Sequence, residues 1–196
     1  MIVQESLIRS RMAEIQDNNI LKEMKEDNPS RIEFYAKIGR KVWVESLSLM
    51  LNFFITYMLY PSILFQKDVK LFDSFQWNIY MINLFFNTGN FLGRSLGRLK
   101  THYSRAFLLS TCFCRLLIIA STFTIAFSSD PLLSHPATVL SNSLLVGLTG
   151  GWFSVASSIS FHRRLKNKEK EHGGFLITTM INGGIAFGSL VSLAGF

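Results

Sequence analysis

Charged residues are scarce in this sequence. They make up 17% of its 196 residues, whereas 48% are hydrophobic and 13% are aromatic; an average soluble domain carries about 25% charged residues. The mean hydropathy is +0.27. The net charge of +7 comes from Lys and Arg that lie almost entirely between apolar segments, without base-reading motifs. We therefore expect a membrane protein that does not bind nucleic acid.

Groups that support catalysis or metal binding are also few. The two cysteines, Cys112 and Cys114, lie two positions apart in one apolar segment and would point in different directions on a helix. The four histidines lack metal-ligand spacing, and no serine has a paired base. We expect no catalytic residue, no metal, no cofactor and no enzymatic activity.

Residues 1–40 lack the early apolar segment of a signal peptide and carry acidic residues that a mitochondrial presequence avoids. An imperfect helical pattern of apolar residues runs over 6–26 and ends at Asn28-Pro29. We expect a polar, partly helical extension, either lying at the surface or docking on a partner.

Five apolar runs occupy most of residues 41–196, at about 42–65, 75–97, 106–127, 137–161 and 174–196. Each is long enough to cross a hydrocarbon core of about 30 Å as a helix. The sequence predicts an all-α, multi-pass membrane bundle that is surrounded mainly by the lipid bilayer.

Basic residues predict the topology. Eight Lys or Arg precede or begin the first run, two lie in the first loop, four lie around the second loop, none lies in 128–136, and five lie in 163–170. Because Lys and Arg are retained on the cytoplasmic side, this alternation places the N-terminus inside and the C-terminus outside. The positive side is the cytosol or a mitochondrial matrix, so the membrane itself is not identified.

The second run carries a polar stripe, at helical steps of three and four: Asn83, Asn87, Asn90, Arg94 and Arg98. Unpaired amides are costly in lipid, so the stripe must face other helices or water. It forms either the wall of a substrate pathway or interhelical hydrogen bonds. Gly89, Gly93 and Gly97 run beside it and predict close helix packing.

Other polar residues lie within the remaining runs. Asn52 and Thr56 belong to a stripe on the first run that begins at Glu45 and could face the second run. Arg115 lies roughly 14 Å into the third run, where an Arg needs a function or a partner. Its candidate partners are Glu45 or the carbonyl groups of a broken helix. Glycines and serines of the fourth and fifth runs predict packing faces, although Gly150-Gly151 could mark a broken segment.

These segments resemble the C-terminal half of the equilibrative nucleoside transporter family, from its seventh to its eleventh helix. The segment at 86–96, FNTGNFLGRSL, resembles the family's eighth-helix signature. Supporting matches are 54–61 with its Tyr-Pro step, Arg115-Leu116-Leu117, and 151–154 with the basic loop that follows. The resemblance covers about residues 40–196 and implies a fold like half of a major-facilitator transporter.

Three departures from the family accompany this resemblance. Asn90 stands where the family has an aspartate, which with the arginine four residues on is implicated in recognising sugar hydroxyls. Asn90 still offers a donor and an acceptor, but Arg94 loses a carboxylate partner. The proline that usually follows the ninth-helix arginine is missing near Ala120. The six helices of the family's first half are not in this sequence.

The resemblance implies half of a nucleoside or nucleobase transporter that works by alternating access. Its substrate-pathway residues would be Asn52, Thr56, Asn83, Asn87, Asn90, Arg94 and Arg115. A separate first half, a second copy, or a longer reading frame would complete it. The alternative is a transporter-derived structural subunit of a larger membrane complex, for example in a mitochondrial inner membrane.

Overall fold

The computed structural model describes residues 31–60, 69, 71–100 and 102–194. The chain divides into two compact units, Met1–Arg40 and Lys41–Phe196. Of the first unit only residues 31–40 are described, and they are helical. The pattern predicted for 6–26 lies outside the described residues.

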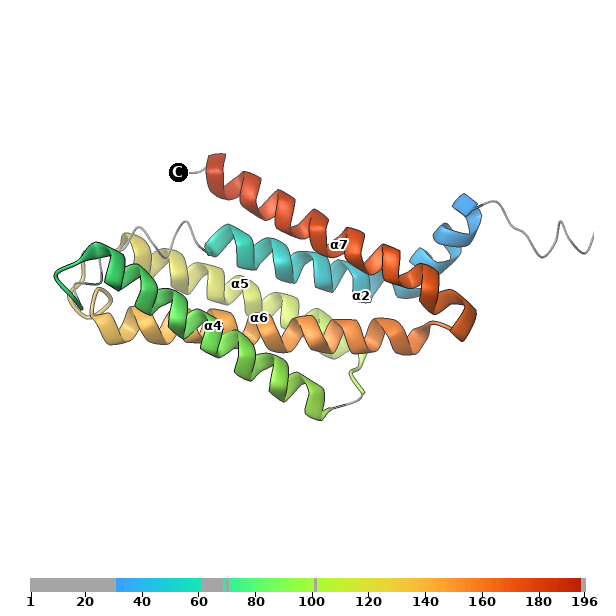
Figure 1. Cartoon of the computed structure of the whole chain (residues 1–196), viewed down its shortest axis with the longest axis horizontal. Coiled ribbons are helices and arrows are strands. Elements are labelled where there is room, and N and C mark those ends of the chain that lie inside the picture. The colour runs from blue at the N-terminus through green and yellow to red at the C-terminus, as the bar shows by residue number, and fades with distance from the viewer. Residues whose placement is uncertain (1–30, 61–68, 70, 101, 195–196) are drawn as a thin grey trace, which may run out of the picture. The chain divides into compact units, whose positions relative to one another are not determined.

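The described residues form five helices and no strand (Figure 1): α2 Arg31–Leu59, α4 Phe75–Leu99, α5 Arg105–Phe127, α6 Pro136–Arg164 and α7 Asn167–Ala194. α2 has non-helical dihedral angles at Val42, next to the boundary between the two units. α6 and α7 extend past their apolar runs into the basic segment that separates them. The predicted all-α bundle is confirmed.

Local capping explains where two helices begin. Ser104 precedes α5 and its side chain accepts a hydrogen bond from the Phe107 backbone N–H at 3.1 Å. At α6, His135 accepts from the Ala137 N–H through Nδ1 at 3.2 Å, and Pro136 occupies the first helical position. Both devices satisfy backbone donors that the first turn of a helix leaves unpaired.

Four segments are long and apolar enough to cross a membrane: 33–59 in α2, 105–127 in α5, 136–164 in α6 and 172–194 in α7. The chain is therefore a multi-pass membrane protein. α4 is 25 residues long, but its Asn and Arg side chains reduce its apolarity, and its role as a fifth span stays a prediction.

Burial separates central from peripheral helices. In the most apolar stretches of α2 and α6, 56% of the residues are buried inside the protein, whereas the value is 22% for α5 and α7. Large apolar side chains such as Phe113, Leu117 and Leu193 are more than two-thirds exposed. A surface of this kind is unstable in water and suits contact with lipid.

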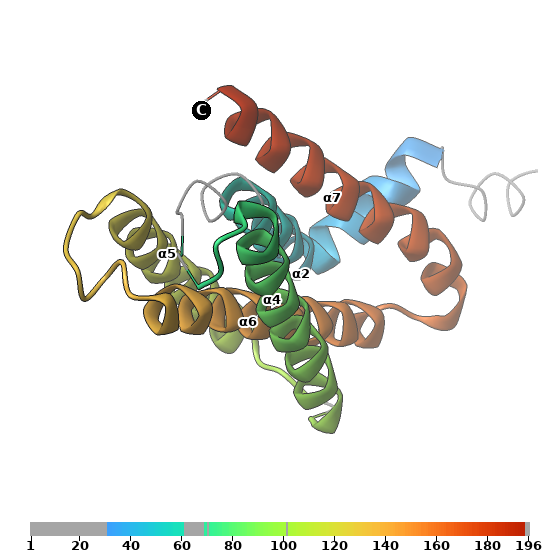
Figure 2. The ribbon, with the colours of Figure 1, turned by 60° about the vertical axis from the view of Figure 1, so that its left-hand side comes forward.

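The glycines of α4 and α6 allow these helices to approach backbone to backbone. A Cβ on Gly93 would meet the Leu148 carbonyl, and one on Gly147 would meet the Phe86 carbonyl. A Cβ on Gly184 or Gly188 of α7 would likewise meet the Met50 or Phe54 carbonyl of α2, with slightly more room. The predicted packing faces are confirmed, and α6 runs unbroken through Gly150-Gly151. The second view shows α4 crossing α6, as these contacts require (Figure 2).

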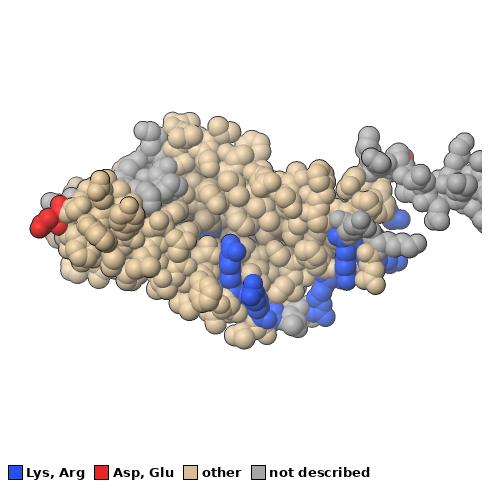
Figure 3. Space-filling view, in the orientation of Figure 1, with Lys and Arg blue, Asp and Glu red and all other residues tan. Residues whose placement is uncertain are grey.

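Basic side chains gather toward one end of the bundle. The space-filling view shows Lys and Arg over the final part of α4 and around the junction of α6 and α7, and acidic atoms at the opposite end (Figure 3). In the sequence, Arg94, Arg98 and Lys100 lie in or directly after the last two turns of α4, and Arg163, Lys166 and Lys170 lie around the junction of α6 and α7.

Candidate functional site

An open cavity of about 280 Å³ lies between α2, α4 and α6. Its lining combines polar and aromatic residues. The polar lining residues are Asn52, Thr56, Asn87, Asn90, Arg94 and Ser154, the aromatic ones are Phe53, Tyr57, Tyr60 and Phe86, and Gly150 completes the lining. Asn87 and Arg94 are exposed, so this wall has polar groups that are accessible to a ligand.

Asn90 and Arg94 form the polar centre of this wall. They lie one turn apart on α4, and the Arg94 Nε donates to the Asn90 Oδ1 at 2.8 Å. The amide thus replaces the family's carboxylate as an acceptor for this guanidinium, without its charge. Arg94 keeps its remaining N–H groups for a ligand or for solvent.

A hydrogen-bonded group of three residues borders the cavity. The Tyr60 hydroxyl and the Asn87 Nδ2 both donate to the Asn83 Oδ1, each at 2.5 Å. The Tyr60 ring stacks on Phe86, with 4.0 Å between ring centres and 9° between planes. Asn83 joins α4 to the end of α2, so the stripe contributes interhelical hydrogen bonds as well as cavity lining.

Arg115 lies behind the wall. Its side chain is 1% exposed and does not line the cavity. Nη1 donates to the Val146 carbonyl at 3.0 Å and to the Thr149 hydroxyl at 3.1 Å, and Nη2 donates to the Asn52 carbonyl at 3.2 Å and to the Thr56 hydroxyl. The guanidinium therefore links α5 to α2 and α6, and it holds the backbone or side chain of two wall residues.

The predicted pairing of Arg115 with Glu45 is wrong. The Glu45 carboxylate, 0% exposed, pairs with Arg164, and with the Arg105 Nε at 3.5 Å. Both partners lie at the basic end of the bundle, whereas Arg115 lies deeper. Carbonyl groups accept hydrogen bonds from both Nη atoms of Arg115, as the alternative predicted, but they belong to intact helices and not to a broken one.

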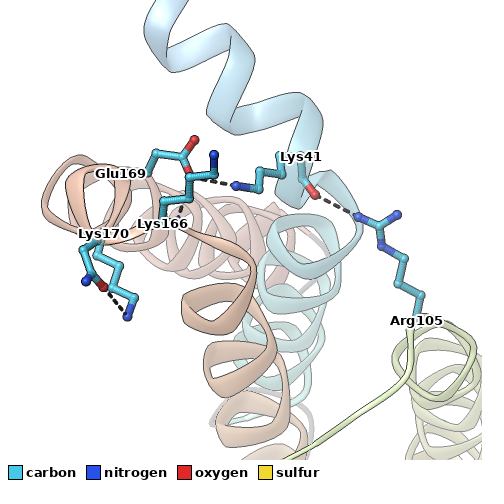
Figure 4. Close-up of polar contacts among 6 residues, drawn as sticks. Lys41, Arg105, Lys166, Glu169 and Lys170 are labelled. Carbon is cyan, nitrogen blue, oxygen red and sulfur yellow. Dashed lines mark hydrogen bonds and ion pairs between the residues drawn. The ribbon is translucent and has the colours of Figure 1, made fainter.

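An ion-pair cluster joins the helices at this basic end. The Lys41 Nζ lies 2.7 Å from the Glu169 Oε2, and the Arg105 Nη2 donates to the Lys41 carbonyl at 2.8 Å (Figure 4). The hydrogen bond from Lys41 is the main reason that the pKa of Glu169 lies below its ordinary value. These contacts tie α2 to α5 and α7.

The described residues hold no group of three or more His, Cys, Asp or Glu placed to bind a metal ion. Cys112 and Cys114 are free thiols. Among the residues that the structure describes, the cavity lining contains no carboxylate, cysteine or histidine.

Comparison with known proteins decides the family. A family model described as "Nucleoside transporter" matches residues 1–194. The chain belongs to the nucleoside transporter family. It is 27% identical over 157 residues to equilibrative nucleoside transporter 4 of Homo sapiens and 26% identical over 160 residues to the protein of the same name from Danio rerio.

These matches cover 79% and 81% of this chain but 29% and 30% of the two relatives. The chain thus spans under a third of the length of the curated relatives it matches. Both relatives are named as transporters.

Within this family member, the structure brings five of the seven predicted pathway residues to one cavity: Asn52, Thr56, Asn87, Asn90 and Arg94. Asn83 borders it and Arg115 lies behind it. Their functional roles stay predictions.

Two aromatic lining residues, Phe53 and Tyr57, were not among the predicted site residues. Phe53, Tyr57 and Tyr60 follow one another at helical steps of four and three and thus share a face. That spacing was the available signal, but in a chain with 18 Phe it does not stand out.

Proposed function

We propose that this chain forms one half of a nucleoside or nucleobase transporter, with the cavity wall of α2, α4 and α6 as its side of the substrate pathway. One observation carries the proposal: polar and aromatic groups of α2, α4 and α6 line one cavity that is open on at least one side. A midplane site between two halves would have this one-sided form.

The chemistry of the wall fits a neutral, planar substrate with polar edges. A nucleobase presents a flat π-surface, which aromatic rings such as Phe53 and Tyr57 bind by offset or edge contacts. Ribose hydroxyls are donors and acceptors, and the Arg94 N–H groups with the Asn90 and Asn87 amides offer both kinds of partner. Because the described lining residues include no carboxylate and Arg94 pairs with Asn90 instead, we expect recognition of the sugar to be weaker than a carboxylate–arginine pair would allow.

The complementary half would come from a longer form of this chain, a separate chain or a second copy. Alternating access then needs each half to move as a unit. Backbone contact between α4 and α6, the Arg115 hydrogen bonds and the ion-pair cluster support such rigidity on this side. We also propose that the N-terminus lies on the positive-inside face and the C-terminus opposite, from the alternation of basic loops.

Uptake measurements test the proposal. The chain would be expressed in cells deficient in nucleoside uptake, alone and together with a six-helix half from a relative, and labelled adenosine, uridine and adenine would be supplied. We expect uptake only in the paired cells. We expect Arg94→Ala to reduce it by about tenfold or more, as removal of a charge-assisted hydrogen bond predicts.

Arg98→Ala is the matched control, because Arg98 lies one turn further along the same helix, is exposed, and does not line the cavity. Equal loss in both variants would contradict the site assignment. An absence of uptake in every combination, with stable recovery in a larger complex, would favour a structural subunit instead.

A further inference from the structure

The orientation of the Asn90 amide is set by its neighbours. Its Oδ1 accepts the hydrogen bond from the Arg94 Nε at 2.8 Å, and a Cβ on Gly151 of α6 would lie 3.0 Å from the same oxygen. Within the described part of the chain, its Nδ2 makes no hydrogen bond and is not enclosed by the protein. Because Asn90 lines the cavity between α2, α4 and α6, the group that it offers to a ligand is an N–H donor.

Arg94 adds further donors one turn along α4. Its Nε is committed to Asn90, and the described hydrogen bonds leave Nη1 and Nη2 unpaired. Arg94 is exposed and lines the same cavity. A guanidinium donates hydrogen bonds and does not accept them. Asn90 and Arg94 therefore form a pair of neighbouring residues whose free groups are donors.

The free acceptor on this face of α4 lies one turn away, at Asn87. The Asn87 Nδ2 donates to the Asn83 carbonyl at 2.9 Å and to the Asn83 Oδ1 at 2.5 Å, so the Asn87 Oδ1 is left to accept. The Tyr57 hydroxyl can donate or accept and does not discriminate. Other side-chain donors of the described lining are committed within the protein: the Asn52 Nδ2 to the Gly150 carbonyl, and the hydroxyls of Thr56, Tyr60 and Ser154 to oxygens of Asn52, Asn83 and Gly151.

A carbonyl oxygen complements the Asn90–Arg94 pair better than the other polar groups of a nucleoside. It has two lone pairs and can accept from both residues at once. An exocyclic amino group would point its hydrogens at donors, and a ring nitrogen offers a single lone pair. A ribose hydroxyl can accept there, but its own proton finds no free acceptor at either residue. Buried donors that a substrate leaves unpaired are the reason that such a site rejects it.

We propose that the Asn90–Arg94 pair binds a carbonyl oxygen of the base, and that Asn90 makes the transporter prefer oxo-nucleobases and their nucleosides to the amino counterparts. The substrate class is then that of uracil and hypoxanthine, and not that of cytosine and adenine. This inference rests on the proposed transport function and adds the substrate class that the same cavity selects.

A purely supporting role of Asn90 leads to a different expectation. If the amide served only to orient Arg94, Asn90→Asp would preserve that contact and leave the choice between bases unchanged. If the Nδ2 binds the substrate, the same change replaces a donor by an acceptor without altering the size of the side chain.

Matched pairs of bases test the inference in cells that express the chain together with a six-helix half. The measurement is the ratio of Vmax/KM for labelled hypoxanthine to that for labelled adenine, and likewise for uracil to cytosine. The test variant is Asn90→Asp. The control is Asn87→Asp, which adds the same charge to the same cavity at a residue whose free group already accepts. A ratio is insensitive to differences in expression between variants.

We expect the wild type to favour hypoxanthine and uracil by about tenfold, as one additional hydrogen bond in the complex predicts. Asn90→Asp should bring both ratios to about one or reverse them, whereas Asn87→Asp should change them by less than about threefold. Equal transport of the paired bases by the wild type, or equal changes of the ratios in the two variants, would overturn this inference alone. An absence of uptake of all four bases and their nucleosides would overturn the proposed transport function together with it.

Discussion

Contact between the backbones of α4 and α6 leads to a graded prediction for glycine substitutions. A Cβ on Gly93 would overlap the Leu148 carbonyl oxygen and lie 2.8 Å from the carbonyl carbon and 2.9 Å from the Trp152 nitrogen. Backbone atoms of a helix cannot rotate away as a side chain does. Gly93→Ala therefore requires the two helices to separate.

The structure sets the size of the effect. Overpacking costs about 1–3 kcal/mol, and a backbone obstacle places Gly93→Ala at the upper end of that range. The higher helix propensity of Ala returns about 1 kcal/mol, so we expect a net loss of about 2 kcal/mol. For a chain of this size, that lowers the Tm by about 4–8 °C.

Two matched substitutions complete the series. A Cβ on Gly97 would lie 3.0 and 3.1 Å from Val155 side-chain atoms and 3.2 Å from the Trp152 carbonyl oxygen, a milder overlap than at Gly93, so Gly97→Ala should lose less stability than Gly93→Ala. A Cβ on Gly183 has nothing within 4 Å, so Gly183→Ala should gain about 1 kcal/mol from helix propensity alone. Thermal unfolding in detergent micelles measures all three. A Tm of Gly93→Ala equal to or above the wild type would refute the described contact, as would equal effects at the three positions.

Three further predictions follow from the buried polar groups. Glu45→Gln should lower the free energy of unfolding by about 1–3 kcal/mol, measured by thermal unfolding in detergent, because it removes a buried carboxylate from two Arg partners that remain charged. Arg115→Lys should be less stable in the same assay than Arg115→Met, because one ammonium group keeps the buried charge but cannot reach acceptors on both α2 and α6; the opposite order would contradict the described hydrogen bonds. Because contact with Lys41 lowers the folded-state pKa of Glu169, its stabilisation is present above the unfolded pKa near 4.5 and is lost as the pH falls through the lower folded value. The Tm difference between wild type and Glu169→Gln should therefore shrink on acidification, and a difference that grows would contradict the ion pair.

The polar residues of α4 show what helical spacing can predict and what it cannot. Helical spacing placed Asn87, Asn90 and Arg94 on one face, and the structure places all three at one cavity. The same spacing did not distinguish the cavity wall from interhelical hydrogen bonding, and Asn83 has the second role. Whether Asn83 bonds to another helix depends on the distance between α4 and the end of α2. The spacing of residues within α4 holds no information on that distance.

Arg115 illustrates the opposite limit. Its position deep in an apolar run predicted a buried cation. Glu45 was the candidate acidic partner because it is the only acidic residue within the five apolar runs. In the folded chain that carboxylate pairs with Arg164 and Arg105. Carbonyl and hydroxyl oxygens of α2 and α6 accept the hydrogen bonds from Arg115. Partner choice depends on distances along the bundle axis, which follow from helix crossing and not from residue type.

The sequence by itself determined the number of helices, the glycine packing faces and the family, because apolar runs, small-residue repeats and motifs are local in the chain. Only the tertiary structure decided which polar groups share the cavity and which oxygen atoms of α2 and α6 accept hydrogen bonds from Arg115. Those arrangements depend on contacts between residues that are far apart in the sequence, and such contacts exist only once the helices have packed.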